Sequence, residues 1–371
     1  MSLPFEIYYI ALTKISGVGP VLAKTIVSYC GSVEAIFCES VKNLSKIPGI
    51  GPITANAIKQ KDVLNIAEYE YQKALEHNIE LLLYLKDSYP ARLKHFPDSP
   101  ILLYKKGQAN LDHLRTVAIV GTRACSTYGK LSTESLVQDL KEYKVMTISG
   151  LAHGIDTLAH KESLRCKIPT VGVMGGGFEK IYPAANRNLA QKMMEEGAII
   201  SEFSFHEVPD REHFPMRNRI IAALSDAIIV VESASKGGSM ITADFGNQYN
   251  KDVFAIPGKT TDQKSQGCNQ LIKINKAALA ESAKDIAYIM GWEKEMTTGQ
   301  MQLPLETFNM EEQKIVDILH AEGEVHFDKI HYQTGINLSS LSQVLLGLEF
   351  KGIVKSIPGK CYLLNKHVYQ P

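Results

Sequence analysis

Short apolar runs alternate with helical stretches through the middle of this chain, and this alternation constrains the fold more than any other feature. The runs are rich in β-branched residues and occupy 116–120, 145–149, 170–174, 198–201, 227–233 and 252–256. Helical stretches begin near Gly129, Gly154, Ala184, Met216, Thr242 and Asn269. Strands that are buried on both faces are continuously apolar, so the pattern predicts a parallel sheet covered by helices on both sides. The expected fold class is α/β, with a doubly wound, Rossmann-like core.

Residues 1–84 predict a small all-helical domain that contains an internal repeat. Segments 15–27 (ISGVGPVLAKTIV) and 47–58 (IPGIGPITANAI) each place Gly-x-Gly-Pro before an amphipathic helix. Glycine permits backbone angles that other residues avoid, and proline suits the first turn of a helix. This is the helix–hairpin–helix pattern, whose turn can hold a DNA phosphate. Alternatively, the two hairpins serve only to pack the domain. The sequence favours this alternative, because neither Lys24 nor Lys59 belongs to a cluster of basic residues.

Three further segments complete the predicted organisation. Residues 85–290 form the core domain, which the chain enters through an extended stretch with an edge strand at 101–104. Residues 291–307, rich in Thr, Gly and Gln, are expected to be a linker. Residues 308–371 predict three helices and a β-hairpin with a Pro-Gly turn, which together make a winged helix. Asn337 is expected to cap the last of these helices. That helix contains no arginine, which favours contact with protein over contact with DNA.

The composition excludes several classes of protein. The chain has 40 Lys and Arg against 40 Asp and Glu, so it is not polybasic, although a local basic stripe suffices for nucleic-acid binding. Its six cysteines are scattered, which argues against a zinc module or a disulfide framework and for a reducing cytoplasm. The sequence has no leader-like segment and no apolar run of membrane-spanning length. We therefore expect a soluble, cytoplasmic protein that makes no membrane contact.

Glycine-rich loops follow several of the predicted strands. They are GTR (121–123), GLAHG (150–154), GGG (175–177) and SKGGSMIT (235–242). The carboxyl ends of parallel strands meet at one edge of a sheet, so these loops are expected at a single rim, where their amides can approach an anion closely. The loops lack the spacing of a dinucleotide fingerprint or a P-loop. We also find no compelling metal-ligand set and no hydrolase triad, so the sequence predicts no metal, cofactor or catalytic residue.

Basic and aromatic residues are expected at the same rim. The segment REHFPMRNR (211–219) places three arginines around Phe214. Arginine makes forked contacts with phosphate, and an exposed phenylalanine can stack on a base of single-stranded nucleic acid. Arg123, Asn186, Arg187 and Lys236 lie on loops of the same rim. The residues alone leave a structural alternative open, in which Phe214 belongs to the core and Arg217 and Arg219 pair with Asp or Glu.

Several motifs keep a common order over residues 89–275. They are YPARLKHFPDSPILLYKKG (89–107), VAIVGTR (117–123), SGLAHGIDTLAH (149–160), MGGGFEKIYPAANRNLA (174–190), FPMRNRIIAALSDAIIVVES (214–233), GGSMITA (237–243), FAIPG (254–258) and GCNQLI (267–272). In these motifs the chain resembles the DNA-processing protein A family, also called DprA or Smf. The resemblance implies a homodimer that binds single-stranded DNA, loads the RecA recombinase onto incoming strands in natural transformation and helps to displace single-strand-binding protein, without catalytic turnover. It assigns the family's DNA pocket to Gly121, Thr122, Arg123, Arg211, Phe214, Arg217 and Asn218.

Residues and resemblance together predict one set of DNA-binding residues: Gly121, Thr122, Arg123, Ser149, Gly150, Asn186, Arg187, Arg211, Phe214, Arg217, Asn218, Arg219, Lys236 and Ser239. Two alternatives remain. The GGSMIT loop is similar to the phosphate loop of lysine-decarboxylase-like phosphoribohydrolases, which act on nucleoside monophosphates. However, Asp244 replaces their glutamate, at altered spacing. The second alternative is a regulator that binds duplex DNA through the winged helix.

Overall fold

The computed structural model describes residues 3–293, 308–351, 353–357 and 359–364. Within it the chain divides into two compact units, Met1–Glu295 and Met296–Pro371. Most of the predicted linker, residues 294–307, lies outside the described residues. The domain boundaries expected from the sequence stay predictions, and the two units are considered separately.

A nine-stranded sheet in the order β1-β2-β6-β5-β4-β3-β7-β8-β9 forms the centre of the first unit. The strands from β6 to β9 in this order run parallel. All six apolar runs form strands: β3 (Thr116–Val120), β4 (Met146–Ser149), β5 (Thr170–Val173), β6 (Ala198–Ser201), β7 (Ala227–Val230) and β8 (Asp252–Ala255). The short strand β9 (Ala278–Leu279) follows at the edge. The predicted doubly wound core is confirmed.

The strand order reverses at β3, and this reversal positions the site. Ala118 in the middle of β3 is in register with Ile148 of β4 on one side and with Ile228 of β7 on the other. In open α/β sheets, ligands bind beyond the carboxyl ends of the strands where the order reverses. The loop that begins at Gly121 therefore leaves β3 at the reversal point.

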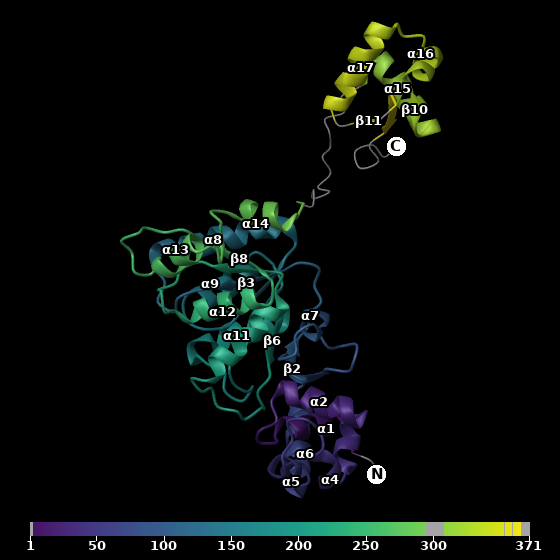
Figure 1. Ribbon diagram of the computed structural model, residues 1–371. Coiled ribbons are helices and arrows are strands. Elements are labelled where there is room, and N and C mark those ends of the chain that lie inside the picture. Colours follow the sequence, from purple (N-terminus) through teal and green to yellow (C-terminus); the bar gives the residue numbers. More distant parts are fainter. Residues whose placement is uncertain (1–2, 294–307, 352, 358, 365–371) are drawn as a thin grey trace. The chain divides into compact units, whose positions relative to one another are not determined.

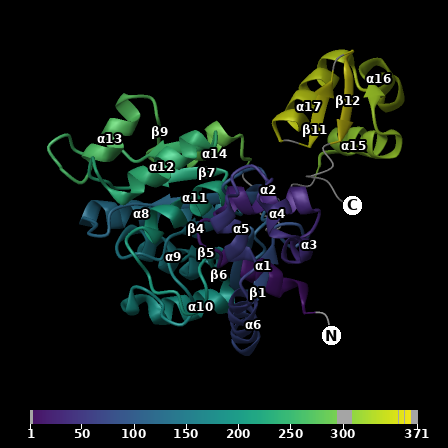
Figure 2. The ribbon, with the colours of Figure 1, turned by 60° about the horizontal axis from the view of Figure 1, so that its bottom comes forward.

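Helices cover both faces of this sheet (Figures 1 and 2). They are α8 (Thr127–Leu140), α9 (Ile155–Arg165), α10 (Arg187–Glu196), α11 (His213–Leu224), α12 (Gly238–Gln248), α13 (Gln266–Lys273) and α14 (Ala283–Met290), with short 3₁₀ turns at Lys141–Tyr143 and Ala184–Asn186. Successive residues of a strand point to opposite faces. Accordingly, Ala118 and Val120 pack with α11, α12 and α13, while Val117 and Ile119 pack with α8, α9 and α14. Burial on both faces explains why the runs are mostly apolar, without a polar face.

The N-terminal helices contain the two predicted hairpin turns. The helices are α1 (Phe5–Thr13), α2 (Pro20–Cys30), α3 (Val33–Cys38), α4 (Val41–Leu44), α5 (Pro52–Ile58) and α6 (Lys61–Glu76). Gly17 and Gly49 have φ angles of +80° and +86°, in the left-handed region that favours glycine. The following glycines cap α2 and α5, whose first turns contain Pro20 and Pro52. The repeat therefore forms two structurally similar turns.

One expectation about the sheet was wrong. Segment 101–104 contributes to β2 (Leu102–Gly107), but β2 is not an edge strand, because β1 (Glu80–Leu83) pairs with its other side. The edge strand β1 lies within the segment that was expected to be wholly helical. A short helix, α7 (Ala91–Lys94), lies between β1 and β2.

Hydrogen bonds from α2 join the N-terminal helices to the core. Lys24 Nζ in α2 donates to the carbonyl oxygens of Phe96 and Pro97 at 2.9 and 3.0 Å and to Ser99 Oγ at 2.7 Å. Burial lowers the pKa of Lys24 to about 8, against the opposing attraction of Asp98. The lysine that follows the first hairpin is thus bonded within the protein, which favours a packing role for that turn.

The second unit contains the predicted three helices and hairpin. Its elements are α15 (Met310–Glu322), β10 (Val325–His326), α16 (Phe327–Thr334), α17 (Leu338–Phe350), β11 (Val354–Ile357) and β12 (Cys361–Leu364). The strands form a sheet in the order β10-β12-β11, and the helices pack around their own apolar core. Asn337 caps α17 as predicted, because its side chain accepts from the Ser340 amide at 2.9 Å. Pro358 of the predicted turn lies outside the described residues.

Candidate nucleic-acid interface

A groove of about 540 Å³ opens at the reversal point of the sheet, and we call it the rim groove. Four segments far apart in sequence form it: the end of β3 with its loop, the start of α9, α11 with the residues before it, and the loop into α12. The predicted residues among its lining are Gly121, Thr122, Arg123, Arg211, Phe214, Arg217, Asn218 and Ser239. The structure therefore brings these eight together.

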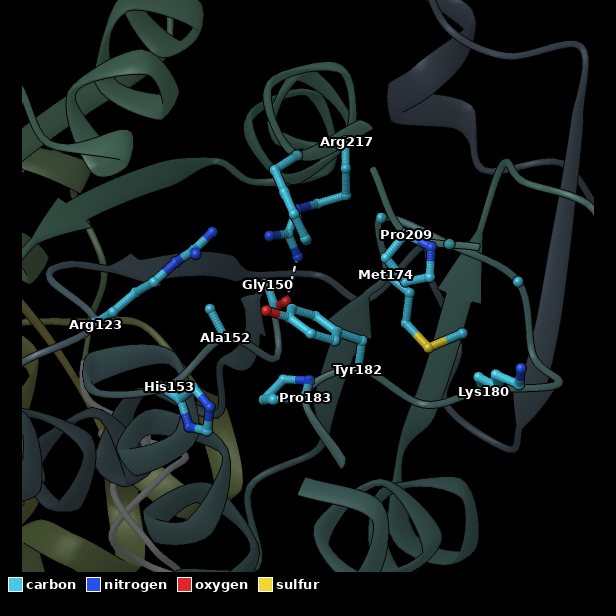
Figure 3. A pocket seen from close by; sticks show the side chains of 14 residues that line it. Arg123, Gly150, Ala152, His153, Met174, Lys180, Tyr182, Pro183, Pro209 and Arg217 are labelled. Carbon is cyan, nitrogen blue, oxygen red and sulfur yellow. Dashed lines mark hydrogen bonds between the residues drawn. The ribbon is translucent and has the colours of Figure 1, made fainter. Parts of the chain in front are cut away.

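A second, smaller hollow of about 20 Å³ adjoins the rim groove, and we call it the glycine pocket (Figure 3). Its walls include Gly150 and the three consecutive glycines 175–177, together with Tyr182 and Pro183. A volume of this size holds about one water molecule. The two hollows share Arg123, Ala152, Phe214 and Arg217, so they are neighbouring parts of one site.

Phe214 lies where the two hollows meet. Its side chain is half-buried, and Arg123 Cζ lies 5.1 Å from the centroid of its ring, in cation–π range. The Tyr182 ring lies on the glycine-pocket side, with its centroid 5.8 Å from that of Phe214. Phe214 is thus not a core residue, and its ring is accompanied by one cation and one aromatic neighbour.

Glu232 holds the loop that presents Arg123 through several hydrogen bonds. The Glu232 carboxylate accepts hydrogen bonds from the Ser126 amide at 2.8 Å and the Ser126 hydroxyl at 2.6 Å. The Glu232 carbonyl accepts from the Thr122 amide at 2.7 Å. A Cβ atom at Gly129 would lie 2.6 Å from the same carboxylate, so a larger residue there would displace it. These contacts fix the loop, while the Arg123 side chain stays exposed.

Arg217 lines both hollows but, in contrast to Arg123, is buried. It is 4% exposed, and its guanidinium donates to the carbonyl oxygen of Gly150 (Figure 3) and to that of Val173. Burial lowers the pKa of Arg217 to about 10. Burial also raises the pKa of Asp156, and the nearby charge of Arg217 opposes that rise. The structure therefore engages Arg217 with protein acceptors.

The remaining predicted residues do not line either hollow, with the exception of Gly150. Arg219 is buried in an ion pair with Glu202, as the structural alternative described. Ser149 is buried and donates to the Ile119 carbonyl at 2.6 Å, and buried Asn186 donates to the Leu151 carbonyl at 2.9 Å. Arg187 and Lys236 are exposed, on α10 and on the loop before α12.

Cationic groups predominate in the described linings of the two hollows. These linings contain the cations Arg123, Arg211, Arg217 and Lys180, against the single buried carboxyl of Asp156. Such a set of charges suits a polyanionic ligand. Sequence reasoning missed Lys180, Tyr182 and Pro209 as lining residues. For Tyr182, the available signal was its position after the third glycine-rich loop.

No helix of the described residues has both the length and the apolar character needed to cross a membrane. Nor do three or more His, Cys, Asp or Glu side chains gather there in a way that could hold a metal ion.

Sequence profiles of known families match all three parts of the chain. The profile described as DNA recombination-mediator protein A matches residues 80–291. A SAM-like helix-hairpin-helix tandem matches residues 9–61, and a DprA winged helix domain matches residues 302–360.

Individual relatives agree with these profiles. Protein Smf of Synechocystis is 30% identical, over 96% of this chain and 98% of its own length. DNA processing protein DprA of Streptococcus pneumoniae is 41% identical, over 58% of this chain and 74% of its own length. The X-ray structure of DprA from S. pneumoniae matches with a TM-score of 0.67 and 33% identity, over 79% of this chain and 99% of that one.

A second solved structure concerns the single-stranded DNA binding mode of DNA processing protein A from Helicobacter pylori. It matches with a TM-score of 0.52 and 29% identity, over 56% of this chain and 96% of that one. The profile match over the whole core and the similarity to Protein Smf along nearly the full length of both proteins lead to one conclusion: the chain belongs to the DNA recombination-mediator protein A family, which is the DprA/Smf family that its motifs resemble.

Proposed function

We propose that the rim groove binds single-stranded DNA. The observation that carries this proposal is the half-buried Phe214 ring, with Arg123 over it, at the junction of a cation-lined groove and a glycine-walled pocket. A base must leave its stack to meet an aromatic side chain, and single strands allow this at low cost. Membership of a family that includes the H. pylori protein supports the same ligand.

Arg123, Arg211 and Lys236 are the phosphate contacts in this proposal. All three are exposed, and Arg123 and Arg211 line the rim groove. The first turn of α12, which begins at Gly238 on the groove wall, adds backbone amides that favour an anion. Arg219 is left out of this set, because its guanidinium is paired with Glu202 away from both hollows.

The proposed biological role is that of a recombination mediator in natural transformation. A cytoplasmic homodimer would bind incoming single strands, load RecA and help to displace single-strand-binding protein. Two grooves on one dimer would raise the apparent affinity through avidity. Family membership supports this role, and the six cysteines, none of them in a disulfide, suit a reducing compartment.

The winged helix fits a protein contact better than a DNA contact. Residues 308–364 carry seven acidic side chains against five lysines: Glu311, Glu312, Asp317, Glu322, Glu324, Asp328 and Glu349 against Lys314, Lys329, Lys351, Lys355 and Lys360. On α17, Leu346 and Phe350 are 53% and 85% exposed. A DNA-reading helix needs cations beside the phosphates, so this apolar, acidic surface does not favour the duplex-binding alternative.

The enzyme alternative depends on Asp244. Its carboxylate pairs with Lys276 Nζ at 3.0 Å and is not part of the lining of the rim groove. This position does not favour action on a nucleoside monophosphate there. Release of free base that is lost in Asp244→Ala would revive the alternative.

Recovery of RecA activity on a coated strand tests the mediator role. RecA and single-strand-binding protein are mixed with a circular single strand, and RecA ATPase activity is followed with and without this protein. We expect the wild type to shorten the lag and Arg123→Ala to do so poorly. Equal lags with and without the wild type would refute RecA loading.

A further inference from the structure

Arg217, which lines both hollows, connects three elements around them. Its Nη1 atom donates to the carbonyl oxygens of Gly150 and Val173, at the carboxyl ends of β4 and β5. Its Nε atom donates to Asn218 Oδ1 at 3.1 Å, and Asn218 Nδ2 donates to the Gly238 carbonyl at 3.3 Å. Because Gly238 begins α12, a continuous series of hydrogen bonds joins two strand ends to the far wall of the rim groove.

These hydrogen bonds occupy most of the N–H groups of the Arg217 guanidinium. A guanidinium has five N–H groups, and three of those in Arg217 point to the protein acceptors named above. Arg217 is 4% exposed, whereas Arg123 and Arg211 are exposed. Arg123 and Arg211 are therefore the more accessible cations for a phosphate in the groove.

The guanidinium also shapes the wall of the glycine pocket. A Cβ atom at Gly150 would lie only 2.4 Å from Arg217 Nη1, so glycine at this position and arginine beneath it fit as a pair. Next in the chain, Leu151 has a φ of +57° and leads to the pocket-lining residues Ala152 and His153. Loss of the guanidinium would leave two carbonyl oxygens without this donor and open space under the turn.

We propose, as a refinement that rests on the proposed binding of single-stranded DNA, that Arg217 is a positioning residue. It holds the ends of β4 and β5 and the start of α12 in the arrangement that lets an unstacked base reach Phe214. It does not neutralise a phosphate. This differs from the role expected from the sequence, in which Arg217 held a phosphate together with Arg123 and Arg211.

The salt dependence of binding separates the two roles. For single strands, each lost phosphate contact reduces the slope of log K against log salt by about 0.7. A positioning residue leaves that slope unchanged and instead weakens recognition of the base. The experiment measures fluorescence anisotropy of the full chain with a labelled thymidine oligonucleotide and with an abasic oligonucleotide of equal length, over a salt series.

For Arg217→Met we expect about a tenfold loss of affinity for the thymidine oligonucleotide, since stacking on Phe214 is impaired. Affinity for the abasic oligonucleotide should change by less than about threefold, and the slope should stay within about 0.3 of the wild-type value. Arg217→Lys keeps a donor near the two carbonyls and should recover part of the loss. Arg123→Met, in contrast, should reduce the slope.

Arg219→Met is the matched control. Arg219 lies on the same helix two residues away, is also buried, and loses one cation on substitution, but it faces Glu202. Any general effect of losing a buried arginine should lower the melting temperature of both variants. Only Arg217→Met should lower the ratio of thymidine to abasic affinity. Gly150→Ala, which displaces the guanidinium without removing its charge, should reproduce that lower ratio if Arg217→Met does not fold.

Each outcome is decisive. A slope that falls in Arg217→Met as much as in Arg123→Met would make Arg217 a phosphate contact and overturn the proposal. An unchanged affinity ratio in both Arg217→Met and Gly150→Ala would overturn it as well. If the wild type binds both oligonucleotides but does not prefer the thymidine one, no base stacks on Phe214 and this refinement is overturned. If it binds neither oligonucleotide, the proposed function fails as well.

Discussion

Glu232 is the buried carboxylate beneath the Arg123 loop, and its replacement tests quantitatively how the rim groove is built. The side chain is 1% exposed and accepts two hydrogen bonds from Ser126, at 2.8 Å from the amide and 2.6 Å from the hydroxyl. The contact with the Thr122 amide uses the Glu232 backbone carbonyl, which any substitution retains. Substitution therefore isolates the contribution of the carboxylate.

The expected magnitude follows from these two bonds. Hydrogen bonds to a charged group contribute about 1.5–3 kcal/mol each, so losing both in Glu232→Ala sets an upper limit of about 6 kcal/mol. Part of this loss of stability is offset, because the variant no longer pays the cost of burying a charge. We therefore expect the free energy of unfolding to decrease by about 2–4 kcal/mol. For a unit of this size the melting temperature falls by about 2 °C per kcal/mol, or about 4–8 °C in total. Glu232→Gln keeps one acceptor oxygen and should lose about half as much.

Calorimetry of the full chain measures this change. Glu196→Ala, an exposed glutamate on α10, is the matched control and should alter stability by no more than about 0.5 kcal/mol. Because the same contact orders the loop, Glu232→Ala should also weaken binding of single-stranded DNA. A melting temperature within about 1 °C of the Glu196→Ala control would refute the account of the Arg123 loop.

Three further predictions concern Phe214, the domain contact and the winged helix. Phe214→Ala should weaken single-strand binding about 5- to 150-fold, the effect of losing 1–3 kcal/mol of stacking, as measured by anisotropy; an unchanged affinity would exclude stacking. Burial lowers the pKa of Lys24 from 10.5 to about 8, so between these values the unfolded chain binds more protons and stability rises with pH. Urea midpoints at about pH 7.5 and 10 should rise less in Lys24→Met than in the wild type, and equal rises would contradict this reasoning. Deleting residues 308–371 should leave single-strand affinity within about threefold of the full chain, whereas a loss above tenfold would give the winged helix a direct role.

The core of this fold was predictable because its strands are buried on both faces. Runs such as 116–120 and 227–230 are almost wholly apolar and are buried at every position, and no amphipathic alternative competes with that pattern. Strand β1 was missed because Glu80–Leu83 consists of glutamate and leucine, which suit a helix, and lies shortly after α6. Its strand conformation depends on pairing with β2, which lies further along the chain. Local sequence does not reveal this tertiary contact.

The site was predictable to the level of its loops but not of its individual side chains. Strand ends placed Gly121, Arg123 and Phe214 at one rim, because topology alone fixes that position. The arginines of α11 could not be sorted in advance. Arg217 and Arg219 are buried by distant partners, the strand-end carbonyls and Glu202, which nothing in the local sequence identifies.

The central claim is that the rim groove binds single-stranded DNA through Phe214 and the exposed arginines. Its most direct test is anisotropy of the full chain with a labelled single-stranded oligonucleotide and with its duplex, over a salt series, for the wild type, Arg123→Ala and Phe214→Ala. The account predicts preference for the single strand, affinity that falls with salt, and weaker binding in both variants, with a reduced salt slope only in Arg123→Ala. Equal binding of duplex and single strand, with neither substitution having an effect, would contradict the claim.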